Sequence, residues 1–203
     1  MEHNSLSAFP ARIALVTSVI FSPLIVPIIT AVFVIEKLAH TRQEVYLWLT
    51  VVAIFVSILP TLAIVLLYRF SKVSNIHLHT KEERLIPLCI TFLSMLVGIF
   101  VLNWIGANNT VIWMCQAYII NTVIFTCITP FWKISFHTSV ATGCIIVLAL
   151  IVNIYLLGLF LLIPLIAWAR IYRKRHTTLQ AIFGTLVALA NTLLYYHFLP
   201  PTN

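Results

Sequence analysis

The stretch Ala-Arg-Ile-Tyr-Arg-Lys-Arg-His-Thr-Thr-Leu-Gln, residues 169–180, lies between two long apolar runs near the C-terminal end of the chain. Charged side chains at such a junction are costly unless they reach water or have a specific partner. The stretch therefore marks where one predicted membrane segment ends and the next begins. It also holds the first candidate residues for a functional site.

Composition places the whole chain in a membrane. Of its 203 residues, 62% are hydrophobic and only 8% are charged, whereas soluble domains carry roughly 25% charged residues. The length admits about seven spans of about 20 residues each, joined by short loops. We therefore predict an all-α, polytopic transmembrane helical bundle that forms a single integral membrane domain, residues 1–203.

Seven apolar segments are predicted as membrane helices. Pro23 and Pro27 predict a kink in the first segment. The break between the fifth and sixth segments, near residues 153–158, has one continuous helix as its alternative. The predicted segments are about 11–34, 45–70, 87–105, 111–131, 139–154, 156–168 and 179–198.

Alternation of the segments puts Arg84, His137 and His176 on one side of the membrane, because an even number of crossings separates them. The same side carries most of the basic loop residues, and the other side carries Lys37 and Arg42. By the positive-inside rule this is the cytoplasmic face, and we expect the membrane to be that of a prokaryotic cell. Short basic loops of this kind meet lipid headgroups, so we expect no nucleic-acid partner.

Acidic residues are scarce. The chain has no aspartate, and its glutamates are Glu2, Glu36, Glu44, Glu82 and Glu83. Enzymes that handle phosphates through magnesium need clustered carboxylates to hold the cation. We therefore predict no metal site and no cofactor, so that any phosphate chemistry depends on Arg, Lys and His.

Two polar junctions carry residues suited to that chemistry. His176 and Gln180 are four apart, so on a helix the amide can reach the imidazole, and Arg170 precedes them. A phosphate held by arginine beside an oriented imidazole is a starting point for nucleophilic attack by histidine. At the other junction, Ser135 begins a predicted helix whose free N–H groups attract an anion, and His137 could protonate a leaving oxygen.

Simpler interpretations remain for several polar residues. The triplet Arg173–Arg175 is more easily explained as an anchor to lipid headgroups. Within the predicted spans, Gln116, Asn121 and Asn191 are expected to form hydrogen bonds between helices rather than a transport path.

The two junctions also resemble a known family. Residues 169–180 resemble the third signature of the type 2 phosphatidic acid phosphatase (lipid phosphate phosphatase) superfamily, which reads Ser-Arg, five residues, His, three residues, Asp. Ala169 stands for its serine and Gln180 for its aspartate. Residues 135–137 resemble the second signature, Pro-Ser-Gly-His. In the first signature, Lys, six residues, Arg-Pro, Arg84 matches the arginine, and Lys81 and Pro87 substitute for its other residues.

The resemblance implies a phosphatase-like core at about residues 81–198 and a metal-independent phosphatase that forms a phosphohistidine. His176 would be the nucleophile, His137 the acid, and Gln180 the residue that orients the nucleophile. The residues implied to bind phosphate are Arg170, Arg84, Lys81 and Ser135. The substrate would be a lipid phosphate or a polyprenyl diphosphate. The alternatives are a non-hydrolytic lipid-phosphate binder or transporter, and a lipid phosphotransferase.

Overall fold

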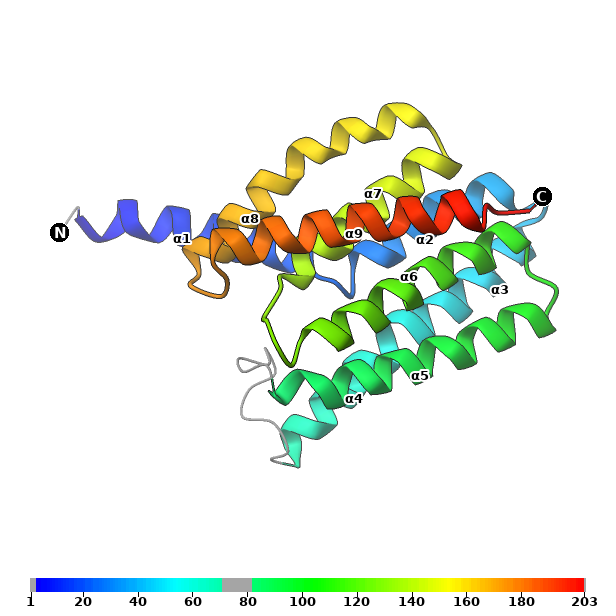
Figure 1. Cartoon of the computed structure of the whole chain (residues 1–203), viewed down its shortest axis with the longest axis horizontal. Helices are drawn as coiled ribbons and strands as arrows, with labels where there is room; N and C mark the ends of the chain where they lie inside the picture. Colours follow the sequence, from blue (N-terminus) through cyan, green and yellow to red (C-terminus); the bar gives the residue numbers. More distant parts are fainter. Residues whose placement is uncertain (1–2, 71–81, 203) are drawn as a thin grey trace.

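The computed structural model describes residues 3–70 and 82–202, and over these residues the chain is helical throughout, with no strand (Figure 1). A π-helical segment, η1, interrupts the third long helix, and a 3₁₀ segment, η2, precedes α8. The elements are α1 (His3–Ile20), α2 (Val26–Leu38), α3 (Arg42–Val52), η1 (Ala53–Ile58), α4 (Leu59–Arg69), α5 (Glu82–Trp104), α6 (Asn109–Ile128), α7 (Phe136–Ile151), η2 (Ile154–Leu161), α8 (Leu162–Tyr172) and α9 (Thr178–Phe198).

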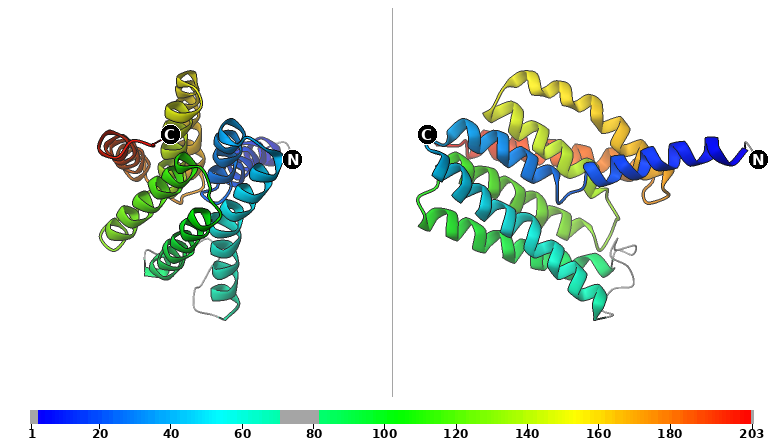
Figure 2. Two further views of the ribbon diagram at one scale, coloured as in Figure 1. Left: turned by 90° about the vertical axis from the view of Figure 1, so that its right-hand side faces the viewer. Right: turned by 180° about the vertical axis from the view of Figure 1, so that it is seen from behind.

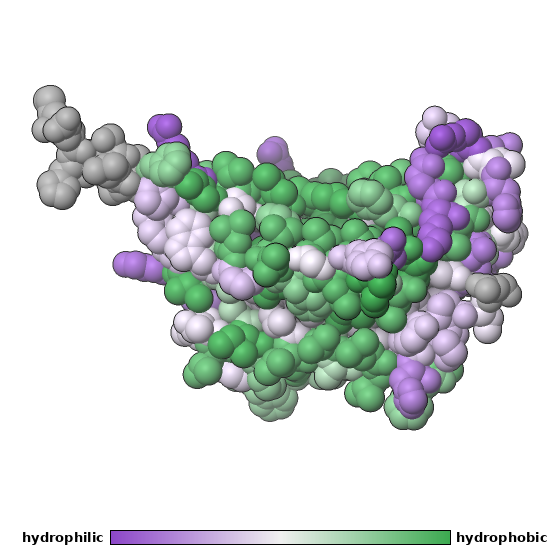
Figure 3. Space-filling view, turned by 90° about the horizontal axis from the view of Figure 1, so that it is seen from above, coloured by the Kyte–Doolittle hydropathy of each residue, from purple (hydrophilic) through white to green (hydrophobic). Residues whose placement is uncertain are grey.

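Five helices in the described part of the chain are long and apolar enough to cross a membrane. They are Arg42–Arg69, Glu83–Trp104, Asn109–Ile128, Ile154–Tyr172 and Thr178–Phe198. Apolar side chains cover the middle of the surface and polar ones gather towards its ends (Figure 3). The prediction of a polytopic helical membrane protein is thereby confirmed, whereas the prediction of about seven spans is not.

The two other predicted spans differ from expectation for local reasons. The first predicted span is broken between Ile20 and Val26 into α1 and α2. Pro23 lies in that break, and Pro27 is the second residue of α2, in the first turn, where proline, which lacks an N–H, is tolerated. The fifth predicted span corresponds to α7, which has 16 residues, so it is short for a bilayer core of about 30 Å.

A tight turn separates α7 from η2, so the continuous-helix alternative is excluded. Asn153 begins η2 and its side chain accepts a hydrogen bond from the Tyr155 N–H, at 2.9 Å. From α2, the Lys37 ammonium donates to the Ile151 and Val152 carbonyls, each at 2.8 Å. These carbonyls end α7, where a cation is favourable.

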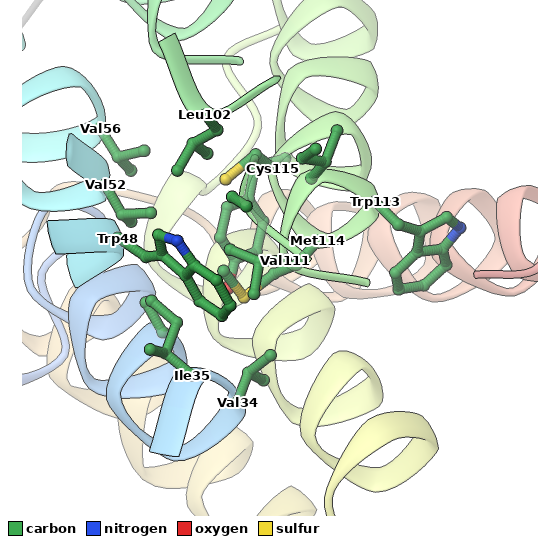
Figure 4. Packing of buried hydrophobic residues seen from close by; sticks show 14 of the residues in the cluster. Val34, Ile35, Trp48, Val52, Val56, Leu102, Val111, Trp113, Met114 and Cys115 are labelled. Carbon is green, nitrogen blue, oxygen red and sulfur yellow. The ribbon is translucent and has the colours of Figure 1, made fainter. Parts of the chain in front are cut away.

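Most of the apolar core lies where α2, α3, η1, α5 and α6 meet (Figure 4). Trp48 of α3 and Ile35 of α2 are almost completely buried, as are Leu102 of α5 and Met114 of α6. This cluster holds the half of the bundle away from the α8–α9 turn. The opposite end is left for polar residues.

Close packing of α9 on α7 orders the start of α7. Gly184 makes this possible, because a Cβ there would lie 2.5 Å from Ser139 Oγ and 2.9 Å from the Ser135 carbonyl oxygen. Across the contact, the Ser135 N–H donates to the Gln180 carbonyl at 3.2 Å, and Thr138 Oγ1 donates to the Ala181 carbonyl at 3.0 Å. The two predicted signature stretches are thus held side by side.

Polar residues inside the bundle connect helices, as predicted. Asn121 of α6 donates to Thr192 Oγ1 at 3.2 Å, and Asn191 of α9 donates to Asn121 Oδ1 at 3.4 Å. Tyr195 donates to Gln116 Oε1 at 2.8 Å. The prediction of interhelical hydrogen bonds is therefore confirmed.

Candidate functional site

Side chains from several distant parts of the sequence line one cavity of about 430 Å³. Its polar end is formed by Arg84 of α5, His137 of α7, Arg170 of α8 and His176, which follows α8. Ser18 of α1 completes this end. An even number of membrane crossings between Arg84, His137 and His176 would bring them together in this way.

The turn after α8 directs His176 back into the cavity. It is a Schellman motif, in which the Arg175 N–H donates to the Arg170 carbonyl at 3.0 Å and the Lys174 N–H donates to the Ile171 carbonyl at 2.8 Å. Lys174 has a positive φ of 53°, as the left-handed position of this motif requires. The turn therefore brings His176 within reach of the helix it has just left.

Gln180 fixes the orientation and tautomer of His176. At the start of α9, Gln180 and Thr177 form a capping box, in which the amide oxygen accepts the Thr177 N–H at 3.2 Å. The same oxygen lies 3.1 Å from His176 Nδ1. Because the Thr177 donor requires an oxygen, the amide cannot be flipped, and His176 Nδ1 must donate. The lone pair of His176 is then on Nε2.

The imidazole of His176 is 7% exposed, and its pKa is lowered to about 3. Burial is the main cause, followed by repulsion from the Arg84 and Arg170 guanidinium groups. The ring is therefore neutral at physiological pH, as a nucleophile must be.

His137 contacts α1, a helix that the resemblance did not include. Its Nε2 lies 3.2 Å from the Ser18 carbonyl oxygen. Because a carbonyl only accepts, His137 carries a proton on Nε2, and Nδ1 is the nitrogen left to take up a second proton. The acceptor is a main-chain carbonyl, so no side-chain pattern in the first apolar run indicated this contact.

Arg84 and Arg170 both line the cavity, and they differ in the contacts that their guanidinium groups make with the protein. Arg84 donates to the Ile134 carbonyl at 3.4 Å, and its guanidinium lies 5.3 Å from the centre of the Phe136 ring, within the range of a cation–π contact. Arg170 is 9% exposed, and its buried Nε has no hydrogen-bond partner among the described residues. A buried charged donor without a partner is costly, so this atom is suited to meet an oxygen of a ligand.

Ser135, one of the residues predicted to bind phosphate, lies outside the cavity. Ser135 is completely buried and lies outside the cavity lining. Its N–H is used by the Gln180 carbonyl, so this N–H is not free for an anion as the sequence suggested. Lys81 lies outside the described residues.

Two other cations lie close to the site and were not predicted to belong to it. Arg173 lines the cavity, so it lies beside the candidate site, and its interpretation as a headgroup anchor stays a prediction. It follows Arg170 by three residues, a spacing that puts both on one helix face. Lys133 has a lowered pKa because of burial and then of repulsion by Arg84, Arg175 and Arg170, in that order, which places its ammonium near them.

The described residues contain no group of three or more His, Cys, Asp or Glu side chains arranged to hold a metal ion. The absence of a metal requirement stays a prediction from the sequence.

Comparison of the chain with protein-family models, with curated proteins and with solved structures found no match.

Proposed function

We propose that this protein is a metal-independent phosphatase that hydrolyses a lipid phosphate or lipid diphosphate through a phosphohistidine on His176. One observation carries the proposal. A neutral histidine, His176, whose Nδ1 is held by Gln180, lines the same cavity as His137, Arg84 and Arg170, which leaves Nε2 for a ligand.

In the first step, His176 Nε2 attacks phosphorus and the bond from phosphorus to the lipid oxygen breaks. Arg84 and Arg170 stabilise the phosphoryl oxygens, whose charge is spread in the transition state. The leaving lipid oxygen takes a proton from His137. In the second step, His137 removes a proton from water, the water oxygen bonds to phosphorus, and the P–N bond to His176 breaks to release inorganic phosphate.

The proton that His137 gives to the leaving oxygen comes from one particular ring nitrogen. Neutral His137 donates its Nε2 proton to the Ser18 carbonyl, so the proton for the leaving oxygen is carried on Nδ1 of the cationic ring. A bound phosphate dianion favours this cation by attraction. Substrate binding thus charges the acid that the first step needs.

We further propose that the chain is a divergent member of the lipid phosphate phosphatase superfamily, with a core at about residues 81–198. The spacing of Arg170, His176 and Gln180 and the Ser135–His137 stretch support this assignment. Gln180 replaces the family's aspartate, and its oxygen still accepts from His176 Nδ1. It does so without a negative charge, so we expect slow turnover.

The topology completes the proposal. The broken α1–α2 unit and α7 cross the membrane together with the five longer helices, which makes seven crossings. The excess of basic residues beside the cavity supports a cytoplasmic site. Accessibility of single cysteines introduced beside Lys174 and beside Arg42 to a membrane-impermeant thiol reagent tests this orientation; labelling of the Lys174 side from outside intact cells would contradict it.

A second candidate function is binding of lipid phosphates without hydrolysis. The observation in its favour is the uncharged Gln180 behind a histidine whose pKa is about 3, since the charged orienting residue of a catalytic triad can contribute about four orders of magnitude in rate.

Phosphate release from a panel of lipid phosphates, in the presence of EDTA, separates the two functions. We expect slow release by the wild type and none by His176→Ala. His197→Ala is the matched control, because His197 is exposed at the far end of α9. Absence of release by the wild type, or equal release by His176→Ala, would contradict the phosphatase proposal.

A further inference from the structure

The cavity extends far beyond its polar end. Along α5 its lining includes Arg84, Leu88, Thr91 and Met95, at spacings of four, three and four residues that form one helix face. Eleven residues of helix separate the first from the last, a rise of about 16 Å. The cavity is therefore elongated along the bundle axis, away from the histidines.

The part of the cavity that follows α5 from Leu88 to Met95, here called the arm, does not require a polar group on the ligand. Its hydroxyls are used by their own helices: Thr91 Oγ1 donates to the Pro87 carbonyl at 2.8 Å, and Thr122 Oγ1 donates to the Tyr118 carbonyl at 2.9 Å. The Asn121 amide donates to a backbone carbonyl and to Thr192. At the other end, Arg170 Nε and Ser18 Oγ are buried without a partner among the described residues.

The cavity also opens towards lipid, beside its polar end. Leu15 and Val19 of α1 and Val65 of α4 line the cavity and are nevertheless exposed on the outer surface. Among the described residues, α1 packs mainly along α8, whereas α4 packs along α5 and η1, so close packing of α1 on α4 does not close the cavity between them. The two helices are well separated in both views of Figure 2.

From these observations we infer that the arm binds the hydrocarbon chain of a single-chain lipid phosphate, whose phosphate lies between Arg84, Arg170 and His176. The inference rests on the proposed function for the identity of the polar end. A chain of up to about 16 Å is enclosed by protein, and Met95, at the far end of the α5 face, limits its length. Short-chain and soluble phosphate esters leave the arm unfilled and bind more weakly.

Binding of n-alkylphosphonates to the purified protein tests the inference. Their P–C bond is not hydrolysed, so the measurement does not depend on turnover. The series from ethyl- to octylphosphonate is monomeric in water, and calorimetry gives each dissociation constant. We expect affinity to increase about two- to fourfold per added methylene, because each one leaves water for an apolar site.

A matched pair of variants on α5 distinguishes the arm from the surrounding detergent or lipid. Leu88 lines the cavity, whereas Leu93 is 58% exposed and lies outside the lining. We expect Leu88→Trp to abolish the gain in affinity from butyl- to octylphosphonate while ethylphosphonate still binds, and Leu93→Trp to keep the full gain. Thr91→Leu is a milder filling variant, expected to flatten the series from hexylphosphonate onward if Leu88→Trp fails to fold.

Two results would overturn the inference. Affinity that does not depend on chain length shows that no chain is bound. The same increase in Leu88→Trp, Thr91→Leu and the wild type shows that the chain lies in detergent rather than in the arm. Phosphate release by the same preparations judges the proposed function separately, since a phosphatase that is indifferent to chain length contradicts only the chain-binding arm.

Discussion

Replacing Gln180 by glutamate tests the weakest element of the proposed site. Glutamate has the same length, so its oxygen can still accept the Thr177 N–H and His176 Nδ1, which lie 3.2 and 3.1 Å from the amide oxygen. It is also the usual partner of threonine in a capping box. The change therefore adds one negative charge behind the nucleophile and preserves the geometry.

The size of the effect follows from that distance. An opposite charge within about 4–6 Å raises the pKa of an imidazole by about one to three units, which corresponds to about 1.4–4 kcal/mol between its neutral and charged forms. If about half of the imidazolium charge has developed in the transition state, the barrier falls by about 0.7–2 kcal/mol. We expect kcat to rise about three- to thirtyfold. The pKa of His176 moves from about 3 to about 4–6 at most, so the nucleophile stays neutral near pH 7.

Steady-state phosphate release from a long-chain alkyl phosphate in mixed micelles, with EDTA present, measures this change. Thr177→Ala is the control. It removes the hydroxyl that accepts the Gln180 N–H at 3.3 Å, which costs about 1 kcal/mol of stability with no change of charge. We expect it to lower the melting temperature and to leave kcat unchanged. A folded Gln180→Glu protein whose kcat is unchanged or lower would refute the assignment of Gln180 as the orienting residue.

Three further predictions concern packing, charge state and phosphate binding. Gly184→Ala should destabilise the protein by about 1–3 kcal/mol, because its Cβ overpacks the α7–α9 contact. Gly158→Ala should have almost no effect on stability, because nothing lies within 4 Å of the added Cβ. Equal melting temperatures of the two variants in detergent would contradict the close packing at Gly184. Only neutral imidazole reacts with diethyl pyrocarbonate, and burial beside arginines lowers the pKa of His176 to about 3. The rate at which His176 reacts should therefore be constant between about pH 8 and pH 5, whereas the rate for an ordinary histidine falls below about pH 6.5. Peptide mass spectrometry measures the rate at His176. Arg173→Ala should raise the KM for an alkyl phosphate about fivefold, because it removes a partly screened charge-assisted contact of about 1 kcal/mol. Lys174→Ala should leave the KM unchanged, because Lys174 lies outside the cavity lining. Equal KM values for the two variants would show that Arg173 does not contact the phosphate.

Local chemistry explains which parts of the fold were predictable. Apolar runs, Asn153 and the basic junctions indicated the helices and the α7–η2 turn, because each depends on a few neighbouring residues. The length of α7 was also predictable, since the predicted segment 139–154 and α7 both have 16 residues, and only the position differs by three residues. The hydrogen bonds from Lys37 to the Ile151 and Val152 carbonyls join residues distant in sequence, so no local pattern indicated them.

The candidate site was likewise predictable only where it depends on neighbouring residues. Spacing suggested that His176 and Gln180 meet on one helix face. Their side chains do lie 3.1 Å apart, but α9 begins at Thr178 and His176 precedes it, so the contact is made at the helix cap rather than on a helix face. The contact of Ser18 with His137 is a meeting of α1 and α7 that no spacing encodes. The structure leaves Ser135 outside the cavity lining, because the start of α7 is covered by α9 through the close approach at Gly184.

The central claim is that His176 Nε2 forms the bond to phosphorus. Rapid mixing with a ³²P-labelled alkyl phosphate, followed by alkaline quenching and peptide mapping, tests it directly, because phosphohistidine survives alkali. We expect the label on the peptide that carries His176, as the Nε2 isomer, since Nδ1 is held by Gln180, and no label in His176→Ala. Phosphate release without a labelled enzyme, or a label on His137, would contradict the account.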